Sequence, residues 1–507
     1  METRFICGAH ARLKPLVACL ALALAVGTGL APVPAGAEVS NRSALQQSLP
    51  LTTSIPLEQR VARGDPLAIR AAAVLANKAP PRPDGGVTVA VTNCNDDGAG
   101  SLRDAVQNIA VTGDTVSMVG LACSTITLTS GAIITAADDL TILGPGTDMN
   151  GVTIEANYNS EIFIHLGAGT FQLEYMTVLN GGKYTTTDAN APGGCVYSTG
   201  QVSMLDTGVK YCIAEAQGTG AALGGGVYAK GGITALSSTI AGNTARGTST
   251  RASGGGLFSQ QGAIFSKYSW IRSNTAAVTN VGAYGYGGGI WNGGDVTILN
   301  STISGNFAGV VAGADFLAFY ATQDLEVGNS TITDNYAYHS SFGGGLYFGQ
   351  AAVVSNSTIT GNEARNPGNV KYGGGITIGN ASSLTMQSSI VLANTLYDGT
   401  THLPDDIGVF GGGVFAGGAN NLVGYSTQEM PPDTIFTADP GLGSLSSANG
   451  GPTPTMAPLT GSSAINNGNN VNNGKYDQRG PGYPRVVGAN TDIGAVESDT
   501  IFANGFD

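Results

Sequence analysis

Charged and aromatic residues are scarce in this sequence of 507 residues. Only 11 % of the residues are charged and 7 % are aromatic, whereas glycine alone contributes 77 residues. The low charge argues against disorder, and the wealth of glycine argues against a large helical core. Together with abundant Ser, Thr and Asn, the glycines favour a fold with many tight turns.

Basic residues and histidines are also few. Asp and Glu outnumber Lys and Arg by 35 to 22, which gives a formal net charge of −13. A chain this acidic repels the phosphate backbone, so we expect no nucleic-acid partner. His165, His339 and His402 stand alone in the sequence. Because no spacing joins them to a second ligand or base, we predict no metal site and no cofactor.

Long apolar runs are absent except at the N-terminus. Three basic residues precede an apolar stretch over residues 16–30, and Ala35-Gly36-Ala37 follows it. This order predicts a signal peptide over residues 1–37 that is cleaved after Ala37. An uncleaved anchor is the alternative, but the run is short for a bilayer span. We therefore expect a mature chain without a transmembrane segment, secreted or held at the surface of a bacterium.

Cysteine is equally rare, and two of the six cysteines, Cys7 and Cys19, lie in the predicted signal peptide. The four that remain are an even number, which argues for disulfides in an exported chain. Three pairings are possible, and proximity along the chain favours one of them. The predicted pairs are Cys94–Cys123 and Cys195–Cys212. Metal binding is the alternative, but the sequence contains no CxxC motif.

Internal self-similarity is the strongest positive signal. A unit begins with glycines, continues through a short apolar stretch and a second, alternating stretch, and ends in Asn. It occurs at residues 224–243, 254–274, 287–306, 343–362 and 373–394, and residues 324–335 keep its second half. The closing residues, 27 to 32 positions apart, are Asn243, Asn274, Asn306, Asn335, Asn362 and Asn394.

The alternation within a unit predicts strands with one buried face. Val296 and Ile298 flank Thr297, and Ile303 follows in a Ser-Thr-Ile motif. We predict an all-β chain, a single-stranded right-handed parallel β-helix. Each coil would hold three short strands, with a loop between each Asn and the next glycines. Stacked coils would place Ile on Ile inside and a ladder of Asn amides in the turns, where Gly and Asn tolerate positive φ.

Residues 101–109 predict a helical cap on the first coil, which would protect the end of the solenoid from aggregation. The stretch Ser101-Leu102-Arg103-Asp104 has the pattern of a capping box. We interpret Arg103 and Asp104 as an exposed pair rather than as catalytic residues. The expected apolar face of the helix consists of Leu102, Ala105, Val106 and Ile109.

The domain boundaries follow from these features. Residues 38–86 predict a peripheral helix and a Pro-rich linker. The β-helix with its cap is assigned to residues 87–430, a C-terminal module to residues 431–497 and a tail to residues 498–507.

Two features resemble known families. The glycine triplet, with an apolar residue three positions before Asn as in Ile303 and Asn306, resembles the repeats of bacterial polymorphic outer-membrane proteins. Those repeats favour GGA and Phe-x-x-Asn, so the match is to the broader right-handed β-helix class. Residues 439–468, YDQRG at 476–480 and DIGAVE at 492–497 resemble the choice-of-anchor Q module of surface proteins. That resemblance implies surface display and contributes no catalytic residues.

Chemistry-bearing residues do not line up in the repeat. Lys230, Lys267 and Asp295 fall at different positions of their units, and two units contain no charged residue. The pairs Asp138-Asp139 and Asp405-Asp406 suggest carboxylates for glycoside cleavage. Adjacent acids on a strand point to opposite faces, however, so neither pair makes a site by itself.

An aromatic residue recurs at one position of the unit. A stacked column there either binds sugar rings or packs as ordinary structure, and we favour packing. Its predicted members are Tyr228, Phe258, Trp291 and Tyr347.

The sequence thus favours an exported, non-catalytic β-helix protein with a cell-surface, adhesive or scaffold role. We expect a monomer whose partners are carbohydrate or cell-envelope components. The alternative is a polysaccharide-active enzyme, either a lyase or a hydrolase, or a carbohydrate-binding β-helix, and only a site can decide between them.

Overall fold

The computed structural model describes Ala73 and residues 80–83, 85–248, 251–280, 284–310, 317–321, 323–338, 343–365, 372–471 and 473–498. The predicted signal peptide with Ala37, nearly all of residues 38–86 and the tail beyond residue 498 lie outside the described residues.

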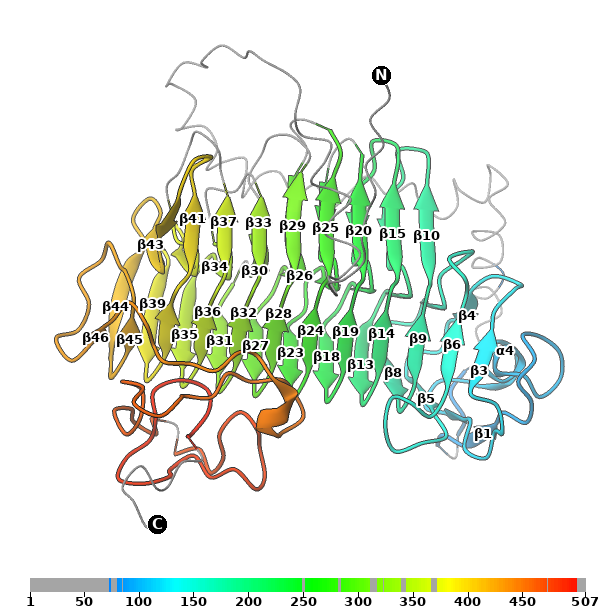
Figure 1. The fold of residues 1–507 in the computed structure, drawn as a ribbon. Helices are drawn as coiled ribbons and strands as arrows, with labels where there is room; N and C mark the ends of the chain where they lie inside the picture. Colours follow the sequence, from blue (N-terminus) through cyan, green and yellow to red (C-terminus); the bar gives the residue numbers. More distant parts are fainter. Residues whose placement is uncertain are drawn as a thin grey trace, which may run out of the picture. The chain divides into compact units, whose positions relative to one another are not determined.

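Four sheets of stacked strands make up the fold (Figure 1). Sheet A contains β1 (Thr88–Ala90), β2 (Thr115–Ser117), β5 (Leu140–Leu143), β8 (Thr170–Glu174), β13 (Gln201–Leu205), β18 (Ile233–Leu236), β23 (Ile264–Lys267), β27 (Val296–Leu299), β31 (Leu325–Gly328), β35 (Ala351–Ser355), β39 (Ser383–Gln387) and β44 (Val414–Ala419). Sheet B contains β3 (Thr125–Thr127), β6 (Thr153–Glu155), β9 (Thr177–Leu179), β14 (Gly208–Lys210), β19 (Thr239–Ala241), β24 (Trp270–Arg272), β28 (Thr302–Ser304), β32 (Thr331–Thr333), β36 (Thr358–Thr360), β40 (Ile390–Leu392), β45 (Leu422–Val423) and β46 (Ile435–Phe436).

Sheet C contains β4 (Ile133–Thr135), β7 (Phe163–His165), β12 (Val196–Ser198), β17 (Val227–Ala229), β22 (Leu257–Ser259), β26 (Tyr284–Asn292), β30 (Leu317–Ala321), β34 (Leu346–Phe348), β38 (Ile376–Ile378) and β43 (Ile407–Val409), with β11 (Ala191–Pro192), β16 (Ala222–Leu223) and β21 (Arg251–Ser253) at its side. Sheet D contains β10 (Gly182–Thr185), β15 (Ile213–Ala216), β20 (Thr244–Gly247), β25 (Thr275–Val278), β29 (Phe307–Val310), β33 (Tyr336–Tyr338), β37 (Glu363–Arg365), β41 (Thr395–Tyr397) and β42 (His402–Pro404).

The chain visits sheets C, A, B and D in turn, as β17, β18, β19 and β20 show, and each coil pairs in parallel with the next. The predicted all-β parallel β-helix is therefore confirmed. The first coils hold the three strands that were expected, and from β10 onward a coil holds four. The fourth strand occupies the stretch after the Asn, where a loop was expected. Its inward column is made of small residues such as Ala245 and Ala276, so the sequence carries little hydrophobic alternation there.

The interior is a column of stacked aliphatic side chains. Ile240, Ile271, Ile303 and Ile332 follow one another in register on sheet B, and all are at most 2 % exposed. Burying one such side chain contributes about 1.5–3 kcal/mol. The inward position predicted for Ile303 is correct.

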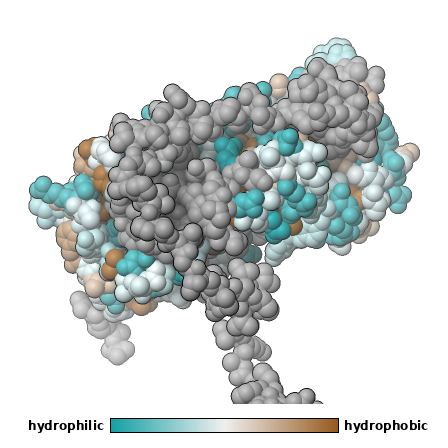
Figure 2. Space-filling view, turned by 90° about the horizontal axis from the view of Figure 1, so that it is seen from above, coloured by the Kyte–Doolittle hydropathy of each residue, from teal (hydrophilic) through white to brown (hydrophobic). Residues whose placement is uncertain are grey.

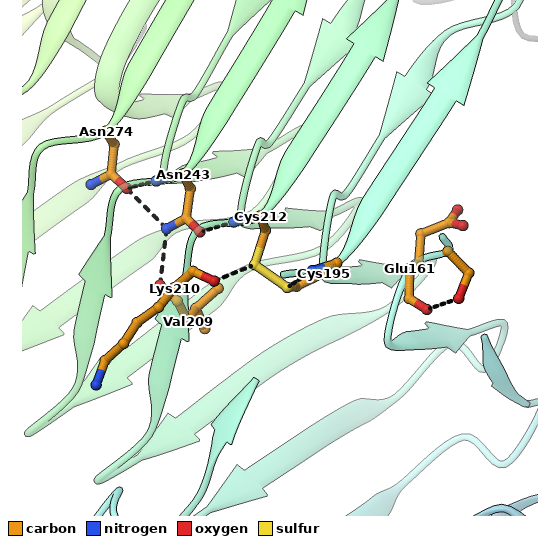
Figure 3. Close-up of a disulfide and its surroundings, with 9 residues drawn as sticks. Glu161, Cys195, Val209, Lys210, Cys212, Asn243 and Asn274 are labelled. Carbon is orange, nitrogen blue, oxygen red and sulfur yellow. Dashed lines mark hydrogen bonds between the residues drawn. A yellow bond between two sulfur atoms is a disulfide. The ribbon is translucent and has the colours of Figure 1, made fainter. Parts of the chain in front are cut away.

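The predicted ladder of Asn amides runs through one corner of the solenoid. Asn243 donates its Nδ2 hydrogen to Oδ1 of Asn274 (2.9 Å), and the same oxygen accepts from the backbone N–H of Asn243 (3.0 Å). The pattern repeats through Asn306, Asn335, Asn362 and Asn394. At one end Cys212 donates its N–H to Asn243 (Figure 3), and at the other end Asp406 accepts from Asn394.

The positive φ angles fall beside these ladder residues rather than on them. Gly242 precedes Asn243 with φ of 67°, and Gly305 precedes Asn306 with φ of 63°. In the other corner, Asn300, Asn329 and Asn356 adopt φ of 45–49°. The expectation that Gly and Asn supply left-handed turn positions is right, but the closing Asn of each unit serves as a hydrogen-bonding residue instead.

A helical cap covers the first coil. α4 (Leu102–Asp104) continues into the π-helix η1 (Ala105–Ile109), and Ser101 Oγ accepts from the N–H of Asp104 (3.1 Å) as expected of an N-cap. Leu102, Ala105 and Val106 join the core, but Ile109 is 44 % exposed, contrary to the predicted face. The widened last turn shifts the helical periodicity, so the fourth apolar position leaves the core.

Arg103 is buried rather than exposed, which corrects its interpretation as half of a surface pair. Its guanidinium donates to Asp96 (2.5 Å) and to the carbonyl oxygen of Gly131 (2.6 Å). Asp96 also accepts from the backbone of Thr129 and Ser130. Burial opposes ionisation of Asp96, but these hydrogen bonds prevail and hold its pKa below the usual range. The pair ties the cap to the next coil.

Both disulfides join cysteines that are close in sequence. Cys94 is bonded to Cys123, and Cys195 to Cys212, which is the pairing that proximity favours. The second bond lies at the start of the Asn ladder (Figure 3). Two disulfides indicate that the chain folds in an oxidising compartment.

The segment after β46 returns along the outside of sheet B (Figure 1). Gln478 accepts from Thr331 Oγ1 (2.6 Å) and donates to Thr302 Oγ1 (2.8 Å), and Ala495 donates its N–H to Thr358. The only regular element within it is the short 3-10 helix η2 (Ser447–Asn449), as far as residues 437–471 and 473–498 are concerned. The segment is held mainly by side-chain hydrogen bonds to the coils.

Candidate functional site

The predicted aromatic column exists, but its rings are buried. Tyr228, Phe258 and Trp291 occupy one register position of sheet C and stack with ring centroids 5.3 and 4.3 Å apart. Their exposed fractions are 8 %, 0 % and 2 %. The ring faces contact one another, and Leu223 of β16 packs against the same cluster. Tyr347 lies on β34, further along the sheet, and is partly buried. This burial favours packing over sugar binding.

A second group of aromatic residues lies on the outer face of sheet D. Inward positions there belong to Ala308, Ala337 and Ala364, so their neighbours in the strands point outward. We call this group the outer-face cluster. It comprises Phe307 of β29, Tyr336 and Tyr338 of β33, Glu363 and Arg365 of β37, Tyr397 of β41 and His402 of β42.

Arg365 occupies the middle of the outer-face cluster. Its guanidinium carbon lies 4.4 Å from the ring centroid of Tyr397 and 5.2 Å from that of Tyr336. Tyr336 in turn stacks on Phe307, with centroids 5.4 Å apart. Burial raises the pKa of Tyr336 above its usual value, so its hydroxyl stays protonated and can donate a hydrogen bond at neutral pH.

Glu363 links the two basic side chains of the cluster. Its Oε1 accepts from Arg365 at 2.9 Å, and its Oε2 lies 3.5 Å from Nδ1 of His402. His402 is half exposed, and its ring lies 4.7 Å from that of Tyr397. The cluster thus combines partly exposed ring edges, a carboxylate, a guanidinium and an imidazole. These groups can donate and accept hydrogen bonds across neighbouring coils.

The solenoid itself does not require these residues. At the same outer positions, β20 and β25 carry Thr244, Thr275 and Ala277, and the rest of the second column is occupied by Arg246, Glu215 and Tyr184 of the earlier coils. β20 and β25 pair in the same parallel register without an aromatic side chain at these positions, and Tyr184 of β10 is the one ring in this column of the earlier coils. The outer-face cluster is therefore an addition to one stretch of the sheet, as expected of a binding surface.

The strand β42 closes sheet D beside the cluster. It pairs antiparallel with β41 across a turn in which Asp398 accepts from the N–H groups of Thr400 and Thr401. Those hydrogen bonds lower the pKa of Asp398. The hairpin brings His402 opposite Tyr397, which the spacing of isolated histidines did not reveal.

The paired acids serve the fold. Asp406 ends the Asn ladder, whereas Asp405 accepts from the N–H of Gly373 (3.0 Å) on another side. Burial raises the pKa of each carboxyl to about 6. Asp138 and Asp139 accept from the backbone of Ala168 and Thr170 in the next coil. Neither pair converges on one point, in keeping with the expectation that adjacent acids diverge.

The remaining histidine of the described region is structural. His165 is fully buried, with Nδ1 2.7 Å from Ser198 Oγ and Nε2 2.8 Å from the carbonyl oxygen of Ala137. Burial lowers its pKa, so it is neutral at physiological pH. His339 lies outside the described residues.

Neither a metal-ion site nor a membrane-spanning helix is found among the described residues. His, Cys, Asp and Glu side chains do not come together there in groups of three suited to a metal ion. Within the same part of the chain, no helix has the length and apolarity needed to cross a bilayer.

The buried ion network of the C-terminal segment explains the sequence features noted there. Arg479 bonds to Asp477 (2.7 Å), and Arg485 lies 3.4 Å from Glu497. All of these side chains are at most 2 % exposed. Burial raises the pKa of Glu497 to about 8. The YDQRG and DIGAVE stretches therefore hold the segment together and contribute no exposed reactive group.

Comparison with known proteins gave no relative. No protein-family model matches the chain, and neither a curated protein nor a solved structure shows significant similarity to it. The resemblances to polymorphic outer-membrane repeats and to the choice-of-anchor Q module therefore remain sequence-based predictions, and the function has to be argued from the outer-face cluster.

Proposed function

We propose that this protein is an exported, non-catalytic scaffold with an adhesive role, which binds a neutral polysaccharide through the outer-face cluster. The observation that carries the proposal is the arrangement of Tyr336, Arg365 and Tyr397 on three successive strands of sheet D. A linear polymer lying along the solenoid axis would meet them one after another, because adjacent strands are about 4.8 Å apart.

The chemistry of the cluster suits neutral sugars. Hydroxyl groups of a sugar both donate and accept, and the cluster offers the carboxylate of Glu363, the guanidinium of Arg365 and the hydroxyl of Tyr336. Since Glu363 already neutralises Arg365 at 2.9 Å, the site has no strong preference for an anionic ligand. Few precisely placed polar groups among aromatic rings are typical of small-molecule and sugar sites.

The same contacts argue against turnover. A lyase would need a free base and a cation to stabilise the charge that develops on the substrate. His402 and Arg365 contain those groups, but Glu363 interacts with both. The enzyme alternative therefore receives less support than binding does.

Surface display is supported by the two disulfides and by a polar exterior. Figure 2 shows mostly hydrophilic and intermediate residues among the coloured atoms, with hydrophobic ones scattered. Such a surface suits a protein exposed to water rather than one buried in a larger assembly.

Co-sedimentation with cellulose, chitin, xylan and peptidoglycan tests the proposal. We expect the wild-type protein to sediment with at least one of them and the double variant Arg365→Ala/Tyr397→Ala to remain in solution. Tyr184→Ala is the matched control, because Tyr184 is an exposed residue of the same sheet at its far end. Equal sedimentation of the double variant, or release of reducing or unsaturated sugars, would contradict a non-catalytic role for this cluster.

A further inference from the structure

A second outer face carries cations without acidic partners. Lys210 ends β14, Arg272 ends β24, and Lys267 ends β23 immediately before that strand. Among the described residues, none of these three forms an ion pair. We call them, together with Tyr211 and Trp270, the cationic face. It stands out on a chain whose formal net charge is −13.

Lys210 and Arg272 lie in one register column of sheet B. Ala241 of β19 lies between them, so their Cα atoms are two strand spacings, or about 10 Å, apart. The strand between them offers only small outward residues, Thr239 and Ala241. Gly208 leaves room for the lysine to fold over its strand, because a Cβ atom there would lie 3.0 Å from Lys210 Cε. In Figure 3 the Lys210 side chain extends away from the Asn ladder.

Aromatic rings position the cations. The guanidinium carbon of Arg272 lies 4.4 Å from the ring centroid of Trp270, whose Nε1 donates to Ser304 Oγ (2.9 Å). Lys267 Nζ lies 5.3 Å from the ring centroid of Tyr268. Tyr211 is 51 % exposed. The rings therefore present partly exposed apolar surface beside positive charge.

The folded chain leaves this charge uncompensated. Among the described residues, the buried Nε of Arg272 has no hydrogen-bond partner. Burial, and secondly the nearby guanidinium of Arg272, lower the pKa of Lys210 below its usual value. Like charges held this close repel each other, so the arrangement does not stabilise the solenoid by itself. A bound anion would reduce the repulsion between Lys210 and Arg272.

The neighbouring coils set the extent of the face. On the next strand, β28, Thr302 donates to the carbonyl oxygen of Pro454, and Asn300, in the turn before that strand, donates to the carbonyl oxygen of Asp477. The C-terminal segment thus covers sheet B from that coil onward, and at Gly480 it also lies against the ring of Tyr268 in the preceding coil. The cationic face occupies the adjoining coils, where no described segment forms hydrogen bonds of this kind to Lys210 or Arg272.

We propose that the cationic face binds a linear acidic polysaccharide, with carboxylates on Lys210 and Arg272 and sugar rings against Trp270 and Tyr211. The two cations follow each other along the solenoid axis, which suits a polymer with regularly spaced charges. The small residues between the cations offer no apolar side chain for insertion into a membrane. This face is separate from the outer-face cluster and does not depend on the function proposed for it.

Binding to sodium polygalacturonate tests the proposal, with its fully methyl-esterified form and phosphatidylglycerol vesicles as comparison probes. We expect wild-type binding that weakens with added salt, and a loss of at least about tenfold in Lys210→Met/Arg272→Met. The control Lys230→Met/Arg246→Met removes the same charge elsewhere and should stay within about twofold. Melting temperatures equal to that of the wild type would show that both variants are folded.

Three results would overturn the inference: unchanged binding in the Lys210→Met/Arg272→Met variant, equal binding of the esterified polymer, or binding to the vesicles in preference to polygalacturonate. The variant Arg365→Ala/Tyr397→Ala should bind polygalacturonate normally. Failure of the neutral-polysaccharide proposal is thus distinguishable from failure of this one.

Discussion

Substituting one residue of the Asn ladder should destabilise the whole solenoid. Asn306 Oδ1 accepts from both the backbone N–H and the Nδ2 of Asn274, each at 3.0 Å. Its own Nδ2 donates to the carbonyl oxygen of Ile271 (3.0 Å) and to Asn335 Oδ1 (2.9 Å). In Asn306→Ala, two donors of Asn274 lose their acceptor in a region that is fully buried. Each buried unsatisfied group costs about 1–3 kcal/mol, so we expect a loss of about 3–5 kcal/mol.

Equilibrium unfolding in guanidinium chloride, followed by far-UV circular dichroism, measures this loss as a change in the free energy of unfolding. The matched control is Asn280→Ala, because Asn280 is exposed and lies two residues after the end of β25. The control should change the free energy by less than about 0.5 kcal/mol. If Asn306→Ala were as stable as Asn280→Ala, the ladder would contribute nothing and the assignment of its hydrogen bonds would be refuted.

Three further outcomes are expected. Ile303→Asp places an unpaired charge in the core and should lower the free energy of unfolding by more than about 4 kcal/mol in the same assay. An unchanged unfolding curve would mean that Ile303 faces solvent. Asp405→Asn should stabilise the protein by about 1–3 kcal/mol at pH 7 but not at pH 3.5. The folded-state pKa of Asp405 is about 6, so the wild type loses stability as pH rises from about 4 to 6. An equal gain at both pH values would contradict this. Cys195→Ser/Cys212→Ser should lower the free energy of unfolding by about 3 kcal/mol, because the two cysteines are separated by 17 residues. Peptide mapping of the wild type without reductant should recover the Cys195–Cys212 pair rather than a crossed pair.

Much of the fold was predictable because the coils repeat. Residues such as Ile303 and Asn306 recur at equivalent positions, and stacking brings equivalent positions into register, so one unit predicts the interior of the rest. The fourth strand was missed because its inward residues are alanines, whose burial leaves little trace in hydropathy. Arg103 was placed on the surface because a lone charged residue in a helix gives no sign of its partner, Asp96.

The outer-face cluster escaped the sequence analysis for a related reason. Tyr336, Arg365 and Tyr397 come from the strand that was taken for a loop, and along their register positions the residue type changes from β33 to β37 and again to β41. The aromatic column of sheet C, by contrast, was found by its repetition, yet its burial depends on β16, which lies beside the main coil. Repetition therefore reveals what the coils share, whereas a binding surface consists of what one stretch adds.

Hydrogen–deuterium exchange, with and without soluble oligosaccharides of the polymer that sediments with the protein, tests the central proposal most directly. We predict that the oligosaccharides slow exchange in peptides containing Tyr336–Tyr338, Glu363–Arg365 and Thr395–Tyr397, and leave Gly182–Thr185 at the far end of the same sheet unchanged. Protection confined to other coils, or no protection under saturating ligand, would contradict the assignment of the outer-face cluster as the polysaccharide-binding surface.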